Sequence, residues 1–221
     1  MSIDLYYKPG SPPCRLVQLV GAALGVEFNL KDINLQAGDH LKPEFLKINP
    51  QHTIPTIVDD GFSLWDSRAI SRYLIYKYAK DSSLYPADPK VRATIDQRVD
   101  FDLGTLYNRF ADYILPQMFE GASADEAKYK KIEEALGFLD KILEGQKYAA
   151  GPELTLADLV LVITVSTIDA VDIPIKPYPN VVRWYELIKT TAPQYEEMNG
   201  KGVEMLRGIV AQRLGAAKES L

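Results

Sequence analysis

The sequence predicts a two-part fold, with an α/β domain over residues 1–79 and an all-helical domain over residues 90–221. In the first part, short β-branched and aromatic runs alternate with apolar residues at helical spacing, whereas the second part shows helical spacing alone. Residues 80–89 hold two prolines and a serine pair, a composition typical of a linker. The full length of 221 residues suits two domains of modest size.

In the α/β domain, the expected order of elements is βαβ, a long loop, then ββα. A strand over residues 3–7 ends at Pro9-Gly10, and a helix with apolar positions from Leu16 to Leu24 follows. This βαβ half predicts a parallel pair of strands joined by a helical crossover. The remaining expected elements are a strand over 27–31, a short helix over 43–48, strands over 56–58 and 62–65 joined by the hairpin signal Asp60-Gly61, and a helix from Ser67.

In the second domain, apolar spacing predicts a long helix that carries Val91 to Tyr113 and ends at Pro116. The run from Leu156 to Ala170 is apolar nearly all round, which predicts a buried central helix. Thr155 and Asp158 form a capping-box pattern at its start, which we interpret as a folding element without a chemical role. Further helices are expected over 132–143, over 181–188 and around residues 205–210.

The composition argues against several classes of function. The net charge of −5 disfavours a nucleic-acid or anionic-membrane partner. Two histidines and one cysteine are too few for a convincing zinc site, and the chain lacks the glycine-rich motifs of common nucleotide-binding proteins. A single cysteine excludes an intrachain disulfide, and together with the lack of a signal-like segment it favours a cytoplasmic location.

Ser11 is the candidate functional residue with the most informative local context. It follows the first strand and the Pro9-Gly10 turn, and it precedes Pro12 and Pro13 at the expected helix start. Serine is a favoured N-cap, and this structural role alone would explain its presence. A helix start also favours an anion, because unpaired N–H groups and the helix dipole point toward it. The residues themselves leave both interpretations open.

Two further stretches lie on the same α/β domain. Residues 51–56 lead into the third strand through Ile54-Pro55, and because most X–Pro bonds are trans, the residues themselves favour a trans bond there. Asp66-Ser67-Arg68 forms a charged helix start, for which ordinary capping is the simplest interpretation. Each stretch is a weak signal alone, but their order and spacing together with Ser11 are specific.

Taken together, these stretches resemble the cytosolic glutathione transferases, most of all the insect delta class, with the epsilon class as a near relative. The resemblance covers essentially the whole chain and is densest in its first third. The segments that carry it are Tyr7 to Arg15, Asn34 to Phe45, Asn49 to Thr56, Leu64 to Ile70, Leu84 to Pro86 and Leu154 to Asp158.

The resemblance implies a thioredoxin-like domain that binds glutathione and a helical domain that lines the electrophile site. Ser11 would be the catalytic residue, because its hydroxyl would stabilise the glutathione thiolate without itself attacking the electrophile. Ile54-Pro55 would be cis, and the main chain of Ile54 would pair with the cysteinyl unit much as an added strand would. The residues expected to bind glutathione are Ser11, His40, His52, Thr53, Ile54, Pro55, Asp66, Ser67 and Arg68.

The resemblance also assigns parts of the ligand to these residues. Asp66 would pair with the γ-glutamyl ammonium, Ser67 would hold the γ-glutamyl carboxylate, and Arg68 would add a positive charge nearby. His52 and His40 would face the glycyl carboxylate. On the electrophile side, Tyr107, Phe110 and Tyr113 are assigned to one helix face. The residues expected to bind the electrophile are Pro13, Leu35, Tyr107, Phe110, Tyr113 and Phe119.

The expected activity is conjugation of glutathione to small apolar electrophiles by a homodimer, with hydrogen halide elimination and peroxide reduction as related chemistry. Glutathione would be a co-substrate, and no other cofactor, metal, nucleic acid or membrane partner is expected. Two alternatives are a non-catalytic carrier of apolar ligands and a glutathione-dependent thiol oxidoreductase. The second is disfavoured because Ser11 stands where such an enzyme has cysteine, and Cys14 is expected to be a buried apolar residue.

Overall fold

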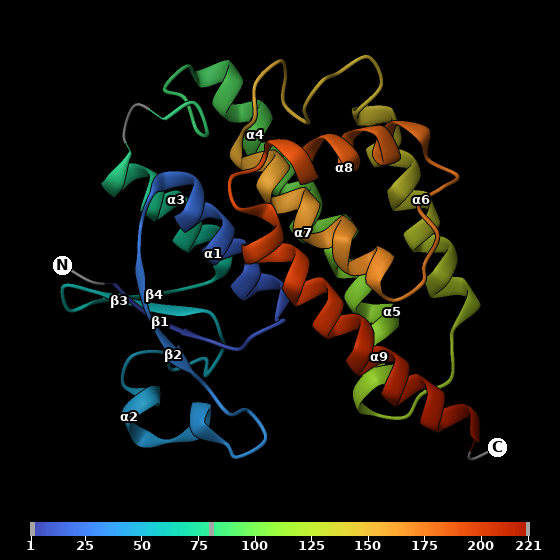
Figure 1. Cartoon of the computed structure of the whole chain (residues 1–221), viewed down its shortest axis with the longest axis horizontal. Coiled ribbons are helices and arrows are strands. Elements are labelled where there is room, and N and C mark those ends of the chain that lie inside the picture. Colours follow the sequence, from blue (N-terminus) through green and yellow to red (C-terminus); the bar gives the residue numbers. More distant parts are fainter. Residues whose placement is uncertain (1–2, 80–81, 220–221) are drawn as a thin grey trace.

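The computed structural model describes residues 3–79 and 82–219, and a four-stranded sheet forms the centre of its first part (Figure 1). The strands are β1 (Ile3–Tyr7), β2 (Phe28–Asp32), β3 (Thr56–Asp59) and β4 (Phe62–Trp65), in the order β2-β1-β3-β4. β1 and β2 are parallel, whereas β1 with β3 and β3 with β4 are antiparallel. β2 lies one residue later than the predicted range of 27–31. Its register pairs Phe28 with Ile3 and Asp32 with Tyr7 of β1.

Two helices of the first part lie between the sheet and the helices of the second part (Figure 1). They are α1 (Pro12–Leu24) and α3 (Ser67–Tyr78), and they pack against each other. α1 also packs on α7 of the second part, so this helix lies where the two parts meet. The short elements η1 (Asp39–Leu41) and α2 (Pro43–Leu46) lie in the loop between β2 and β3.

The second part is helical throughout its described residues. Its elements are α4 (Pro89–Phe101), the π-helical turn η2 (Asp102–Leu106), α5 (Tyr107–Phe119), α6 (Glu126–Ile142), α7 (Leu156–Ala170), α8 (Pro179–Thr191), the π-helical turn η3 (Glu196–Gly200) and α9 (Lys201–Glu219). α7 is buried along nearly its whole length, which confirms the central helix predicted from its apolar composition. Within the described part of the chain, no helix combines the length and apolarity that a membrane crossing requires.

The prediction of one long helix ending at Pro116 is wrong in two respects. The helical path is divided by η2, and α5 continues through Pro116 to Phe119. A proline inside a helix removes the N–H that would pair with the carbonyl four residues earlier. Here the Asp112 carbonyl accepts a hydrogen bond from Lys128 Nζ on α6 (3.2 Å). This external donor provides the carbonyl with the partner that Pro116 cannot supply.

The capping box predicted at the start of α7 is confirmed. The Asp158 carboxylate accepts hydrogen bonds from the Thr155 N–H (2.9 Å) and the Thr155 hydroxyl (3.1 Å). Its other oxygen accepts from the Ala149 N–H (2.7 Å) and from Trp184 Nε1 on α8 (2.8 Å). Asp158 is fully buried, so one carboxylate connects the start of α7 to α8 and to the preceding loop.

Candidate functional site

Ser11 occupies the N-cap position of α1, but its side chain makes no capping hydrogen bond. Its N–H donates to the Lys8 carbonyl (3.2 Å), and its carbonyl accepts from the Arg15 N–H (2.9 Å). The sequence suggested several free N–H groups at this point, but Pro12 and Pro13 have none, which weakens the contribution of the helix start. An anion bound here therefore depends strongly on the Ser11 hydroxyl.

Cys14 lies three residues after Ser11 in the first turn of α1 and is fully buried, as predicted. Burial raises the pKa of its thiol to about 11, although a hydrogen bond with the Ser11 side chain acts in the opposite direction. Cys14 therefore stays protonated near neutral pH.

Cys14 is therefore expected to be inert in the folded protein. At pH 8, a thiol of pKa about 11 is ionised in only about one molecule in a thousand, and only the thiolate reacts. A chromogenic thiol reagent should label native protein very slowly and should label one thiol per chain after unfolding in denaturant. Fast labelling of the native chain would contradict this and would favour the thiol oxidoreductase alternative.

A cavity of about 280 Å³ opens beside Ser11 at the junction of the two parts. The turn between β1 and α1 forms one wall, and α5, α7 and α9 form the others. Its lining is almost entirely apolar, so it suits an uncharged apolar ligand. The lining residues are Lys8, Pro9, Gly10, Ser11, Pro12, Leu35, Tyr107, Phe110, Ala111, Ile114, Leu115, Met118, Phe119, Thr167, Val171, Leu206 and Ile209.

Two of the residues expected to bind the electrophile lie outside this lining. Tyr113 packs its ring edge against Tyr129 of α6, with ring centroids 5.7 Å apart. At about 100° per residue, positions i and i+6 lie about 120° apart on a helix, so Tyr113 cannot share the face of Tyr107. Ile114, at i+7, takes that place. Pro13 also lies outside the lining, whereas its neighbour Pro12 is part of it.

The loop before β3 contains the cis Ile54-Pro55 bond that the resemblance implies. Asn49 is fully buried beneath this loop, and its Nδ2 donates to the Thr53 carbonyl (3.0 Å) and to Thr56 Oγ1 (2.9 Å). Among the described residues, no hydrogen bond uses the main chain of Ile54, which leaves both groups free for a peptide ligand. Sequence analysis missed Asn49, for which the Asn49-Pro50 pair was the available signal.

The two histidines lie side by side near this loop, with ring centroids 6.0 Å apart. His40 Nδ1 is buried and lacks a hydrogen-bond partner within the described part of the chain. His52 has a φ of 47°, a backbone conformation that is uncommon for residues other than glycine. Since an unpaired buried nitrogen is costly, this pair is well suited to accept an anionic group from a ligand.

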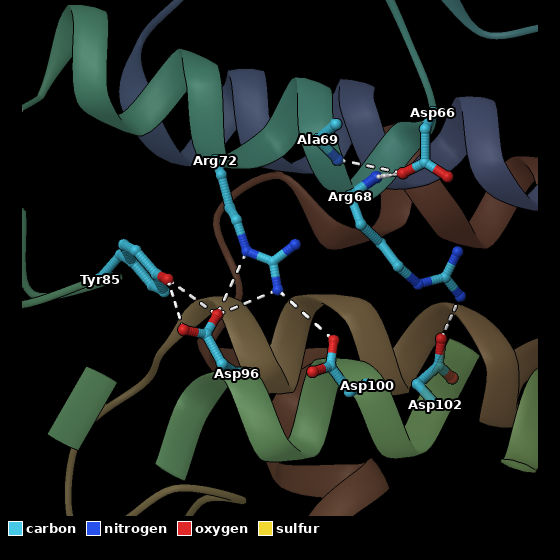
Figure 2. Close-up of polar contacts among 8 residues, drawn as sticks. All are labelled: Asp66, Arg68, Ala69, Arg72, Tyr85, Asp96, Asp100 and Asp102. Carbon is cyan, nitrogen blue, oxygen red and sulfur yellow. Dashed lines mark hydrogen bonds and ion pairs between the residues drawn. The ribbon is translucent and has the colours of Figure 1, made fainter. Parts of the chain in front are cut away.

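Asp66 and Ser67 form the start of α3. Asp66 has a φ of 69°, and its Oδ1 accepts the N–H groups of Arg68 (2.9 Å) and Ala69 (3.1 Å) (Figure 2). The carboxylate thus caps the helix with one oxygen, and it remains exposed to solvent. Ser67 is buried at the first position of the helix.

Arg68 points from α3 toward the second part of the chain, and its guanidinium pairs with Asp102 of η2 (Figure 2). It also lies over the Tyr107 ring, 5.6 Å from the centroid. One turn further along α3, Arg72 pairs with Asp96 (3.0 Å), so two arginines of α3 each form an ion pair with the second part. Burial raises the pKa of Asp102, whereas Arg68 and the Thr164 hydroxyl act in the opposite direction. The Arg68 guanidinium is therefore already paired with a carboxylate of the protein itself.

The described residues contain no group of three or more His, Cys, Asp or Glu side chains that could hold a metal ion. The chemistry available in this geometry is anion stabilisation by a hydroxyl beside an apolar cavity. The main-chain groups of Ile54, which are unpaired among the described residues, and the imidazoles of His40 and His52 lie between β2 and β3. The start of α3, capped by Asp66, follows β4.

Comparisons with known proteins place this arrangement in a family. The glutathione S-transferase N-terminal domain model matches residues 5–82, and the glutathione S-transferase C-terminal domain model matches residues 94–190. The structure is similar to a delta-class glutathione transferase of Nilaparvata lugens, at 51% identity with a TM-score of 0.94, covering 96% of this chain and 99% of that one.

Two other insect structures are also similar. A glutathione transferase of Bombyx mori is 44% identical with a TM-score of 0.91, covering 95% of this chain and 98% of its own. An epsilon-class glutathione S-transferase of the housefly, Musca domestica, is 39% identical with a TM-score of 0.90, covering 96% and 98%. The chain belongs to the glutathione S-transferase family. The resemblance stated from sequence, including its delta and epsilon classes and its thioredoxin-like and helical domains, is confirmed.

Proposed function

We propose that this chain conjugates the thiolate of glutathione to small apolar electrophiles. The observation that carries the proposal is Ser11, which lines an apolar cavity of about 280 Å³ and whose hydroxyl makes no capping hydrogen bond. A free thiol has a pKa of about 8.5, so little of it is ionised at neutral pH. Lowering that pKa by about two units requires roughly 2.7 kcal/mol of preferential anion stabilisation. A hydroxyl donor at a helix start provides an interaction of this kind.

In this proposal, glutathione lies along the loop before β3 and the start of α3. Its cysteinyl unit pairs with the main chain of Ile54, and its glycyl carboxylate faces His52 and His40. Its γ-glutamyl end meets Ser67 and the second oxygen of Asp66, which makes no hydrogen bond among those found for the described residues. Glutathione is the co-substrate, and the electrophile occupies the cavity between α5, α7 and α9.

The proposal is tested by titrating the thiol of bound glutathione through its thiolate absorbance, alongside conjugation to a chlorodinitrobenzene-type electrophile. We expect the bound thiol to ionise about two pH units below the free thiol, and the purified protein to form the conjugate. Tight binding of apolar ligands without conjugation would instead favour a carrier.

We also propose that the chain is a homodimer. The elements β4, α3, α4 and η2 leave large apolar side chains exposed, namely Phe62, Tyr76, Tyr78, Val91 and Leu103. Covering such side chains in a partner interface would remove apolar area from water. Light scattering of the purified protein should give twice the chain mass of 24.7 kDa, and a monomer mass would contradict the proposal.

A further inference from the structure

Arg15 is a buried arginine without a carboxylate partner. It lies on α1 four residues after Ser11, and 1% of its surface is exposed. Its guanidinium donates to Asn199 Oδ1, to Thr167 Oγ1 (2.7 Å) and to Ser166 Oγ (3.5 Å), which are all neutral acceptors. Its Nε has no hydrogen-bond partner among the residues that the structure describes. Among the described side chains, no carboxylate lies within ion-pair distance of this guanidinium.

The acidic groups around Arg15 do not compensate its charge either. They are Tyr195, Tyr185, Tyr107 and Cys14. Burial raises the pKa of each of them, and that of Cys14 reaches about 11, so all four are neutral near pH 7. Burial lowers the pKa of Arg15 to about 10, which still leaves it positively charged at that pH.

The second buried arginine nearby does not share this situation. Arg68 lies over the Tyr107 ring and is already paired with Asp102. Its charge is therefore balanced within the protein, whereas the charge of Arg15 is not.

The surroundings hold the Arg15 side chain in place. At Gly202 of α9, an added Cβ would lie 2.4 Å from Arg15 Cδ, so the start of this helix packs directly on the arginine. Thr167, which accepts from Arg15, also lines the cavity beside Ser11. Thr167 therefore lies between the guanidinium and the cavity in which the thiol of glutathione would react.

We propose that Arg15 is a positioning residue whose uncompensated charge stabilises the thiolate of glutathione bound at Ser11. This inference rests on the function proposed above. A buried charge without a counter-charge is unfavourable, so an anion that arrives on the cavity side offsets part of its cost. Unit charges separated by several ångströms at the effective dielectric of a protein interior interact enough to shift a pKa by about one unit.

The test titrates the thiol of bound glutathione in the parent and in Arg15→Met, Arg15→Lys and Asn199→Asp. Arg15→Met removes the charge, and the nearly isosteric Asn199→Asp supplies the missing carboxylate. Both should raise the pKa of the bound thiol by about one unit, which leaves about tenfold less thiolate below that pKa. Arg15→Lys keeps a positive charge and should keep the pKa close to that of the parent.

Two controls separate this electrostatic role from a structural one. Gln97→Glu makes the same change in net charge as Asn199→Asp, but at an exposed position of α4, and should leave the thiol pKa unchanged. S-methylglutathione has no ionisable thiol, so its affinity should be similar in the parent and all variants. A variant that binds this analogue normally has kept its binding site.

The inference is overturned if Asn199→Asp and Arg15→Met bind S-methylglutathione normally and leave the thiol pKa at the parental value. Should Arg15→Met fail to fold, an unchanged pKa in Asn199→Asp is sufficient to overturn it. If the parent itself does not lower the thiol pKa, the proposed function fails instead, so the two failures are distinguishable.

Discussion

Replacing Ser11 by alanine is expected to lower kcat/KM for conjugation by about 10²- to 10³-fold, the usual cost of losing one hydrogen-bond donor to a developing anion. The structure makes a large effect reasonable, because Pro12 and Pro13 deprive the helix start of N–H donors. Stability should change by no more than about 0.5 kcal/mol, since the hydroxyl makes no capping hydrogen bond. Initial rates and thermal unfolding measure the two quantities.

The pH dependence of this loss gives a sharper test. In the parent, the pKa of bound thiol is expected below its free value of about 8.5, so the thiolate is present from nearly neutral pH upward. In Ser11→Ala, the thiolate forms only at a higher pH, closer to the free value. The loss should therefore be largest at and below about pH 6.5 and should shrink above about pH 8.5.

A loss that is equal at all pH values would show that Ser11 acts by something other than thiol ionisation. Thr190→Ala provides a matched control, because it removes a hydroxyl from an exposed position of α8. This variant should retain parental rates over the whole pH range.

Replacing Asp158 by alanine is expected to lower the free energy of unfolding by about 4 kcal/mol, because several buried donors lose their acceptor at about 1–3 kcal/mol each. The donors are the N–H groups of Thr155 and Ala149, the Thr155 hydroxyl and Trp184 Nε1. Typical domains are stable by only 5–15 kcal/mol, so the variant should unfold at much lower denaturant concentration.

Asp125→Ala is the matched control for this prediction. Asp125 caps α6 through the N–H groups of Ala127 and Lys128, but it is exposed to solvent. Water can replace its hydrogen bonds, so the expected cost is about 1 kcal/mol. Similar costs for the two variants, measured by denaturant unfolding, would contradict the view that burial makes Asp158 important.

Local sequence signals located most of the secondary structure. The Asp60-Gly61 signal lies in the β3–β4 turn, where both residues have positive φ (51° and 80°). The capping box lies at the start of α7. Such features depend on contacts between residues close in sequence, so their pattern is visible in the chain itself. The predicted end at Pro116 was wrong because a distant lysine on α6 supplies the donor that allows α5 to continue.

Some residues of the candidate site are likewise visible in local sequence patterns, whereas others are brought to it only by tertiary packing. Ser11, the loop before β3 and the start of α3 each belong to a short strand–turn–helix pattern or loop that the sequence displays. Thr167, Val171, Leu206 and Ile209 complete the cavity from α7 and α9. Nothing in their own segments indicates that they face Ser11, because that proximity arises only when the two domains pack.

By itself, the sequence determined the order of elements, the family and the hydroxyl that a thiolate would meet. Tertiary structure decided that Arg68 is paired with Asp102 while Arg15 is left without a counter-charge, although both are arginines near the start of a helix. The physical reason is that the energy of a buried charge depends on the groups brought around it by distant helices. Spacing along the chain does not report those groups.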